Sequence, residues 1–583
     1  MFDLLIKNGT IIDGTGAAAY RGDVAVIGDT IVEMGKVSGA AKRIIDAEGR
    51  LVTPGWVDIH THYDGQATWD DQLAPSFWHG VTTVVMGNCG VGFAPVAPAK
   101  RDWLIQVMEG VEDIPGSALA EGIKWGWETF PEFLDALSAK SYALNVGAQV
   151  PHAAVRSYVM GERGAANEAA TEDDLYRIGA AVTEGMEAGA FGFTTTRSTM
   201  HRALDGSRVP GSLAADEELH TIARAVGRSG RGLIGVAPAG LAGDDLIAPA
   251  REIAWMNEVS SRYGVPVTFL CLQNGAQPDW WREQLAECRR QRANGARVMP
   301  QVYSRAVGAV ITLENKINPF RASSTMRELE RYPLAERARR LREDPELRAR
   351  VVAEGVHGQF REGEQYKKLF ESAWENIYPS TGQINYEPEP DGSIAAIARR
   401  EGRDPRDVAL GALLEDEGRG MLLHQMAGYS NGSLEPHHEM LSDPDTIIGG
   451  GDGGAHVGVI CDSGVPTFML TYWARDRRRG ECLPLEFVIR KQTSATARAF
   501  GISDRGELRP GFKADINIID YDRLQFETPF LTNDLPTGAA RLMQKARGYD
   551  ATFVNGVMIQ ADGEDTGARP ARLLRSQPAA TFA

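Results

Sequence analysis

Eight short apolar runs, most of them separated by helical segments, constrain the fold of this 583-residue chain more than any other feature. Each run has the length of a strand, and the intervening stretches, such as DDLYRIGAAVTEGMEAG, have helical periodicity. Strand–helix alternation implies parallel strands, and eight such units predict an α/β fold of the (β/α)8 TIM-barrel type. The runs are 56–62, 82–89, 144–150, 191–196, 232–237, 267–272, 297–302 and 446–452.

The two ends of the chain resemble each other more than they resemble the middle. Both carry short β-rich runs punctuated by Gly-containing turns. We therefore expect 1–55 and 501–583 to build one small β-sandwich around a catalytic barrel at 56–500. Charged helical sequence fills about 305–440, before the eighth run. It is either a solvated surface layer or an insertion that covers the barrel mouth, and we favour the second because long barrel insertions usually carry function.

The composition limits the kinds of partner that this protein is expected to bind. A formal net charge of −16 argues against a nucleic-acid binder and fits a protein that acts on small molecules. No apolar run approaches the roughly 20 residues of a membrane span, and the N-terminus lacks the apolar core of a signal peptide. Five dispersed cysteines form no disulfide framework. These features predict a cytoplasmic protein without membrane or nucleic-acid partners.

Two histidines end the first run, in PGWVDIHTHYDG. His60 and His62 are two apart, so on a strand both side chains point to the same side. Active sites of barrels lie at the carboxyl ends of the strands. Two neutral imidazoles that converge there suit a divalent metal such as Zn²⁺. The alternative is a pair of hydrogen-bonded core histidines.

Two further candidates end neighbouring strands. Cys89 ends the second run, and Asp452 ends the eighth, which lies beside the first in a closed barrel. A thiolate binds zinc well, and a carboxylate can both bind a metal and take a proton from water. A buried structural cysteine and a turn aspartate are the alternatives. The pattern predicts a metal site on strands eight, one and two, with Asp452 also the catalytic base.

Several motifs are similar to the amidohydrolase superfamily, and in particular to its N-acyl-D-amino-acid deacylase (D-aminoacylase) branch. They are PGWVDIHTHYD, GVTTVVMGNCG, GAFGFTTT and LRPGFKADINIID. The resemblance implies one or two zinc ions, or another divalent metal, with the cysteine of GNCG as a ligand and the strand-eight aspartate activating water. It also implies a homo-oligomer that acts on a small-molecule amide, which in that branch is an N-acyl amino acid of D configuration.

The chain departs from this family at two strands. The resemblance places further histidine ligands at the ends of strands five and six, where this sequence has Ala237 and, by our register, Cys271. Other residues on the same face are candidates for an additional ligand or an acid/base group. These are His152, His201, Cys271 and His456.

Candidates for substrate contacts lie near the same strand ends. Tyr63 follows the two histidines and Asn88 precedes Cys89. A substrate carboxylate calls for an arginine fork. Arg197 is the first candidate for that fork, with Arg156 and Arg305 as others.

The leading hypothesis is a metal-dependent hydrolase of carbon–nitrogen amide bonds outside peptides. A cyclic-amide hydrolase or a deaminase of the same superfamily is one alternative. A catalytically silent small-molecule-binding barrel is another, which the missing strand-five and strand-six histidines favour. The sequence has four potential ligands that a silent barrel would not need, and this argues against the silent barrel. They are His60, His62, Cys89 and Asp452.

Overall fold

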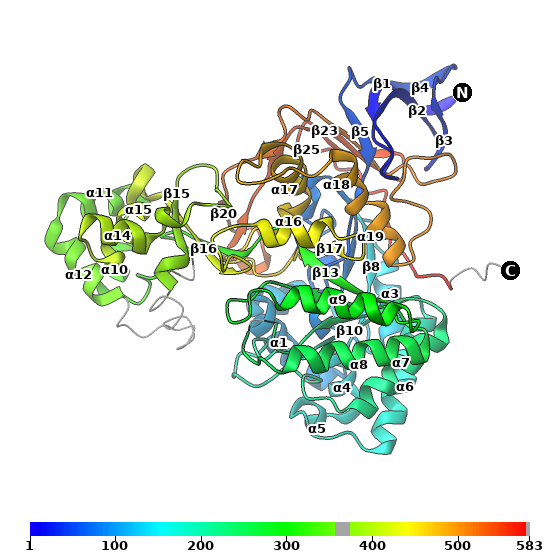
Figure 1. Ribbon diagram of the computed structural model, residues 1–583, viewed down its shortest axis with the longest axis horizontal. Coiled ribbons are helices and arrows are strands. Elements are labelled where there is room, and N and C mark those ends of the chain that lie inside the picture. The colour runs from blue at the N-terminus through cyan, green and yellow to red at the C-terminus, as the bar shows by residue number, and fades with distance from the viewer. Residues whose placement is uncertain (242, 316–317, 356–372, 579–583) are drawn as a thin grey trace.

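The computed structural model describes residues 1–241, 243–315, 318–355 and 373–578, which form a mixed α/β structure (Figure 1). Each of the eight apolar runs contains a strand, and the third run is split between two. The strands are β6 (Trp56–Asp58), β7 (Val81–Met86), β8 (Asn145–Ala148), β9 (Val150–Pro151), β10 (Gly192–Thr196), β11 (Leu233–Ala237), β12 (Val267–Cys271), β13 (Val298–Tyr303) and β17 (Ile447–Gly449).

These strands pair in parallel in two sheets. One has the order β6-β7-β8 and the other the order β17-β13-β12-β11-β10-β9. A single residue, Gln149, separates β8 from β9. At the opposite edges, the segments after β6 and β17 pair through a bridge between Thr61 and Gly453. The two sheets therefore adjoin at both edges, and the segments that follow the first and eighth strands lie side by side.

Helices follow the strands as the alternation predicts. α6 shows the local reasons: Thr171 and Asp174 form a capping box at its start, and Ile178, Val182 and Met186 bury one face at helical spacing. The helices of this body are α1 (Arg101–Glu112), α2 (Gly116–Gly122), α3 (Phe130–Ser138), α4 (His152–Met160), α5 (Glu162–Ala165), α6 (Glu172–Glu187), α7 (Asp216–Ser229), α8 (Ala248–Tyr263), α9 (Trp280–Arg292), α16 (Glu435–Ser442), α17 (Val465–Phe468), α18 (Leu485–Lys491) and α19 (Ser494–Ala499). A π-helix spans Met469–Asp476.

Both ends of the chain enter one nine-stranded sheet. β5 and β18 join the two halves by antiparallel pairing, with Val52 opposite Ile518. The strands are β1 (Phe2–Ile11), β2 (Tyr20–Ile27), β3 (Thr30–Gly35), β4 (Ala41–Asp46), β5 (Leu51–Pro54), β18 (Ile516–Ile519), β23 (Tyr549–Val554), β24 (Val557–Ala561) and β25 (Glu564–Asp565). Two short ladders flank it, β19 (Gln525–Phe526) with β22 (Ala546–Arg547) and β20 (Phe530–Thr532) with β21 (Arg541–Met543).

The segment between β13 and β17 forms a lobe with its own hydrophobic core, on the left of Figure 1. Phe320, Leu341 and Leu413 are fully buried in that core. Its sheet, β14-β16-β15, differs from the sequence analysis, which predicts only charged helical sequence for this segment and does not single out short apolar runs such as AVGAVI. The elements are β14 (Val307–Ile311), α10 (Ser324–Leu329), α11 (Leu334–Glu343), α12 (Pro345–Gly355), β15 (Ile377–Ser380), α14 (Ile394–Glu401), α15 (Pro405–Gly418) and β16 (Met421–Ala427).

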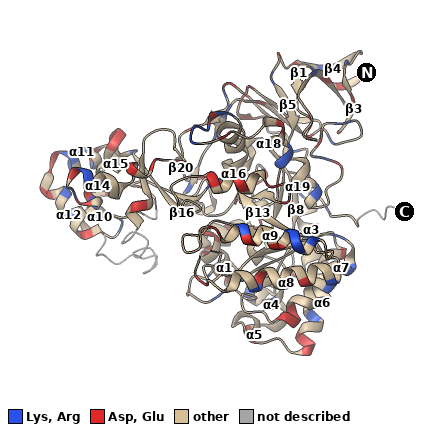
Figure 2. Cartoon of the chain, viewed as in Figure 1, with Lys and Arg blue, Asp and Glu red and all other residues tan. Residues whose placement is uncertain are grey.

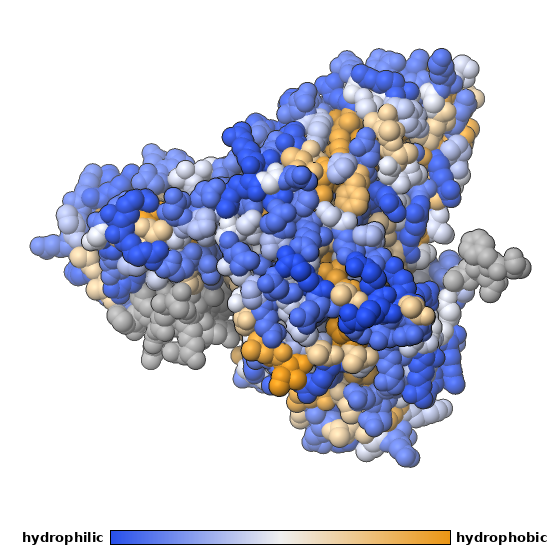
Figure 3. Space-filling model, in the orientation of Figure 1, coloured by the Kyte–Doolittle hydropathy of each residue, from blue (hydrophilic) through white to orange (hydrophobic). Residues whose placement is uncertain are grey.

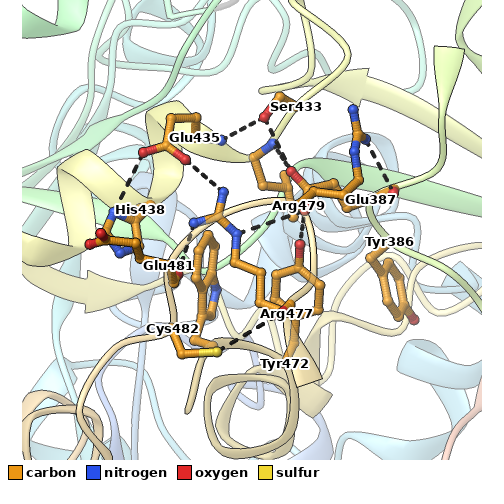
Figure 4. A network of polar contacts seen from close by, with 12 residues as sticks. Tyr386, Glu387, Ser433, Glu435, His438, Tyr472, Arg477, Arg479, Glu481 and Cys482 are labelled. Carbon is orange, nitrogen blue, oxygen red and sulfur yellow. Dashed lines mark hydrogen bonds and ion pairs between the residues drawn. The ribbon is translucent and has the colours of Figure 1, made fainter. Parts of the chain in front are cut away.

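A buried polar network ties the base of this lobe to the elements on either side of β17 (Figure 4). The carboxylate of Glu387 accepts a hydrogen bond from the Leu434 backbone N–H at 2.6 Å and another from the Tyr472 hydroxyl. Arg477 extends the network through an ion pair of 2.8 Å with Glu435. Buried hydrogen bonds to charged groups contribute more than neutral ones. The network therefore fixes the lobe relative to the π-helix.

The surface is mixed in charge and mostly hydrophilic. Lys and Arg alternate with Asp and Glu along the visible helices (Figure 2), and hydrophobic residues appear in small groups, one of them near α1 and α8 (Figure 3). Among the described residues, no helix combines the length and apolar character that a membrane crossing requires.

Gly80 offers a test of how the parallel strands pack on the terminal sheet. It has φ +74°, and an added Cβ would lie 2.4 Å from the Tyr549 ring and 2.8 Å from Asn517. Gly501 has φ +70° with open space around it. We expect Gly501→Ala to cost only the left-handed backbone term of about 1–2 kcal/mol. Gly80→Ala adds an overpacking term of about 1–3 kcal/mol.

Calorimetric unfolding midpoints of both variants check this prediction. Gly80→Ala should lower the midpoint clearly more than Gly501→Ala does. Equal shifts would contradict the close approach of the two layers at Gly80.

Candidate metal and active site

The two histidines of the HxH motif are held by backbone pairing with the segment after β17. Asp452 N donates to His60 O at 2.9 Å, and His62 N donates to Gly453 O at 2.7 Å. Both imidazoles are almost fully buried. The pairing brings Asp452 to the two histidines although nearly 400 residues separate them in sequence.

In each imidazole, Nδ1 contacts a supporting side chain and Nε2 points toward Asp452. His60 Nδ1 lies 2.6 Å from Gln301 Oε1, and His62 Nδ1 lies 3.3 Å from Glu112 Oε1. An acceptor atom beside each Nδ1 favours the proton at that nitrogen, which leaves the Nε2 lone pair for a ligand. Asp452 Oδ1 is 3.3 Å from His60 Nε2 and 3.6 Å from His62 Nε2.

Cys89 completes the cluster of donors. Its Sγ lies 3.6 Å from His60 Nε2, and the donor atoms of His60, His62 and Cys89 all fall within 4.8 Å of one another. The structure therefore brings together the four residues singled out from strands eight, one and two. Two imidazole nitrogens, a thiol and a carboxylate are a donor set that suits zinc.

The backbone at this cluster departs from ordinary conformations. Cys89, Asp452 and His456 have φ of 54°, 45° and 49°, in the left-handed region. Gly87 and Gly90 flank Cys89, and a Cβ at either would meet backbone atoms at 2.5 Å and 2.8 Å. Strained residues that persist in a fold concentrate at functional sites. Here the strain directs the thiol and the carboxylate toward the histidines.

The electrostatics favour a bound cation. Burial raises the pKa of the Cys89 thiol well above its ordinary value, and the negative charges of Glu112 and Asp452 add to that shift. Burial lowers the pKa of His62 to about 4. Burial also opposes ionisation of Asp452, but its hydrogen bond to His62 and the nearby His60 outweigh that effect and lower its pKa. A divalent cation at the cluster would offset the cost of a buried thiolate and carboxylate.

Two of the additional candidates lie beside the cluster. His456 Nε2 is 3.6 Å from Glu112 Oε2, which also faces the site. His201 Nδ1 is hydrogen-bonded to the Thr196 hydroxyl at 2.8 Å. Burial lowers the pKa of His201 to about 4, and the proximity of His456 and His62 contributes. Both remain candidates for an acid/base or ligand role.

The other two additional candidates do not lie at the cluster. His152 is fully buried, and its ring nitrogens contact Thr195 at 2.8 Å and Glu218 at 2.7 Å. Cys271 turns toward α9, where its thiol contacts Gln284 at 3.7 Å. The prediction that Cys271 is an additional ligand was wrong. Side chains alternate along a strand, so the two neighbours of Cys271 point toward the site and Cys271 points away from it. Those neighbours are Leu270 and Leu272, which pack with Ala237 and Cys89.

An apolar wall thus occupies the side where the family resemblance places histidines. Ala237 and Leu270 line a cavity of about 10 Å³ together with His60, Asn88 and Gln301. That volume accommodates about one water molecule. The described residues of strands five and six supply no ligand to the cluster.

The residues proposed for substrate contacts have other partners. The Tyr63 side chain is fully buried and its hydroxyl donates to Ser76 at 2.8 Å, so the prediction that it lines the pocket was wrong. The Asn88 amide donates to the carbonyls of Thr61 and Val85 and accepts from Gln149. It therefore braces the strand ends rather than facing a substrate.

The three arginines are likewise engaged in ion pairs. Arg197 Nε donates to Glu252 at 2.8 Å, and its Nη1 donates to the Ala214 carbonyl at 3.0 Å. Arg156 pairs with Glu218, and Arg305 pairs with Asp462 at 3.0 Å. Arg156 and Arg305 are also deeply buried. A carboxylate fork at Arg197 would have to break its pair with Glu252. In Arg305 only Nη2 is engaged, and its Nε and Nη1 have no hydrogen-bond partner among the described residues.

The sequence analysis missed three residues that face the cluster. Glu112 ends α1, Gln301 lies within β13, and Tyr303 ends β13. Burial raises the pKa of Tyr303 well above its ordinary value, and the charges of Asp452 and Cys89 raise it further. A polar glutamine inside the apolar run RVMPQV was a usable signal. Nothing local marked Glu112, because its partners come from other strands.

Comparisons with known proteins show the family to which the chain belongs. A model of the Amidohydrolase family matches residues 43–560. D-aminoacylase of Alcaligenes xylosoxydans xylosoxydans is 26% identical, with 98% of this chain and 97% of that protein covered. N-acyl-D-aspartate deacylase of the same organism is 28% identical, with 98% and 95% covered.

A solved structure agrees in fold along its whole length. It is the N-acyl-D-glutamate deacylase of Bordetella bronchiseptica, complexed with zinc and a phosphonate inhibitor that mimics the tetrahedral intermediate of the reaction. The two structures superpose with a TM-score of 0.62 at 24% identity, covering 98% of this chain and 99% of that chain. With a family model matched across most of its length and a donor cluster at its strand ends, this chain belongs to the amidohydrolase family.

Proposed function

We propose that this protein is a metal-dependent hydrolase that cleaves the C–N amide bond of an N-acyl amino acid of D configuration or of a related small amide. The observation that carries the proposal is the convergence of His60, His62, Cys89 and Asp452 on one point. The named D-aminoacylase and deacylase relatives, which match nearly the whole chain, support the choice of bond and substrate class.

The donor set fits zinc on chemical grounds. His60 and His62 would bind through Nε2, Cys89 through Sγ and Asp452 through Oδ1, and the acceptors at both Nδ1 atoms hold the rings in that orientation. A bound zinc ion supplies Lewis acidity, which polarises a carbonyl and acidifies water. One ion would be held by the cluster of His60, His62 and Cys89, with Asp452 beside the two imidazoles. A second ion would draw on residues such as His456.

Asp452 is suited to carry the proton through the reaction. Its carboxylate would take a proton from the water as the oxygen attacks the amide carbon, and would give it to the amine nitrogen as the C–N bond breaks. The pKa of Asp452 lies below its ordinary value, so the base is ionised at neutral pH. Tyr303 would donate a hydrogen bond to the carbonyl oxygen, since its ring lies against Gly450, two residues before Asp452, and packs in the same cluster as Cys89.

The engaged arginines favour a second candidate. A cyclic-amide hydrolase or a deaminase needs no clamp for a free carboxylate, and Arg156, Arg197 and Arg305 are already paired. A silent binding barrel is the least favoured candidate. Such a protein gains nothing from a buried thiol and carboxylate beside two imidazoles, which are costly to bury.

We also propose a domain organisation around this site. The eight parallel strands would form a closed (β/α)8 barrel over 56–500, with the terminal sheet as a separate sandwich domain of 1–55 and 501–583. The insertion at about 305–440 would border the barrel mouth. We further propose a cytoplasmic homo-oligomer whose partner is a small-molecule amide. The adjoining sheet edges and the shared terminal sheet support the architecture.

Metal analysis of the purified, dialysed protein is the first test. We expect about one equivalent of zinc or another transition metal per chain. We expect its loss in His60→Ala, because that change removes the donor that lies 3.6 Å from Cys89 Sγ and 3.3 Å from Asp452 Oδ1. A protein that neither contains metal nor takes it up on reconstitution would overturn the proposed function.

Cysteine substitutions give a matched comparison. Cys89→Ser should weaken zinc binding, because a hydroxyl is a poor replacement for a thiolate ligand. Cys271→Ser should leave zinc content unchanged, because that thiol faces Gln284 of α9. Zinc titration of both metal-free variants checks the prediction, and equal effects would contradict the assignment of Cys89.

Asp452→Asn tests the base. We expect hydrolysis of N-acetyl-D-amino acids to fall by a factor on the order of 10²–10⁴, the range for loss of general acid–base catalysis. A ninhydrin assay of the released amine measures it, with the L-enantiomers as comparison substrates. Ring opening of hydantoins and deamination of aminopyrimidines are followed by the change in their ultraviolet absorbance. Turnover of a hydantoin or an aminopyrimidine but of no N-acyl amino acid would move the assignment to the second candidate.

A further inference from the structure

Glu112 has an unusual position for a carboxylate. It is the last residue of α1, only 1% of it is exposed, and Asp113 after it is left-handed with φ 51°. The carboxyl end of a helix carries a partial negative charge, which disfavours an anion there, and burial adds to the cost. A carboxylate kept in this position needs specific partners.

Its partners are two histidines of the candidate site. Oε1 lies 3.3 Å from His62 Nδ1. Both atoms are buried and neither has a hydrogen-bond partner among the described residues, so each is the nearest charged or polar group available to the other. Oε2 lies 3.6 Å from His456 Nε2. The Glu112 backbone carbonyl also accepts a hydrogen bond from the His456 N–H at 2.5 Å. One residue thus contacts the HxH motif and the loop that follows Asp452.

The geometry separates Glu112 from the donor cluster itself. Nδ1 and Nε2 lie on different edges of the His62 ring; Nδ1 faces Glu112 and Nε2 faces Asp452 Oδ1 at 3.6 Å. An acceptor at Nδ1 fixes the proton there and leaves the Nε2 lone pair for a ligand. His60 has the corresponding contact with Gln301, a neutral amide. His62 therefore faces a carboxyl group where His60 faces a neutral amide.

We propose that Glu112 is a positioning residue of the metal site: it accepts the Nδ1 proton of His62, directs Nε2 toward Cys89 and Asp452, and holds the His456 loop against the same carboxylate. This inference rests on the proposed function, because it presumes that His62 binds a metal.

Zinc affinity is the measurement that tests it. Metal-free wild type, Glu112→Ala and Glu112→Gln would be titrated with zinc in competition with a chromogenic chelator. We expect Glu112→Ala to weaken zinc binding by about 10–100-fold, the usual effect of removing such a partner. Glu112→Gln keeps the side-chain volume and an acceptor oxygen, so it should recover most of the affinity. The number of zinc ions per chain should not change.

The control is Glu109→Gln, one turn earlier on α1 and only half-buried, which should bind zinc as wild type does. Wild-type affinity in Glu112→Ala would overturn the inference alone. Loss of one zinc per chain in both Glu112 variants would also overturn it, since Glu112 would then be a ligand. A wild type that takes up no zinc would overturn the proposed function and this inference with it.

Discussion

The backbone pairing between the first and eighth strand ends is the constraint on which the rest of the site depends. Two hydrogen bonds, from Asp452 N to His60 O and from His62 N to Gly453 O, hold the two segments edge to edge. Side chains alternate along a strand, so a slip of one residue would turn the imidazoles away from Asp452. The donor distances of 3.3 Å and 3.6 Å follow from this register.

Around that register the fold concentrates groups that are costly to bury. Cys89, Asp452 and Glu112 are all potential anions in a water-poor environment, and the first two also have left-handed backbone conformations. Polar partners at both Nδ1 atoms reduce the cost for the imidazoles but do little for the anions. Buried anions without a counter-charge would destabilise the fold, whereas a bound cation would neutralise them. The strained backbone therefore serves the binding of a cation.

The insertion contributes by holding the loop after Asp452. Val310 N donates to Val459 O at 2.7 Å, and Asn315 Nδ2 donates to Gly458 O at 2.6 Å. His456 lies two residues before Gly458, so the lobe and Glu112 approach this loop from different elements. The lobe therefore contacts the site indirectly, through the backbone of the loop that contains His456. Whether it also covers the barrel mouth remains a prediction of the sequence.

The sequence by itself determined the strand segments, the alternation with helices and the four converging donors. These depend on periodicity and on the ends of strands, which neighbouring residues encode. Only the tertiary structure decided which way Cys271 faces, that the arginines are already paired, and that Glu112 and Gln301 support the histidines. Such contacts depend on strand register and on the rotation of each helix over the sheet. Those are set by packing between residues far apart in the chain, and no local pattern records them.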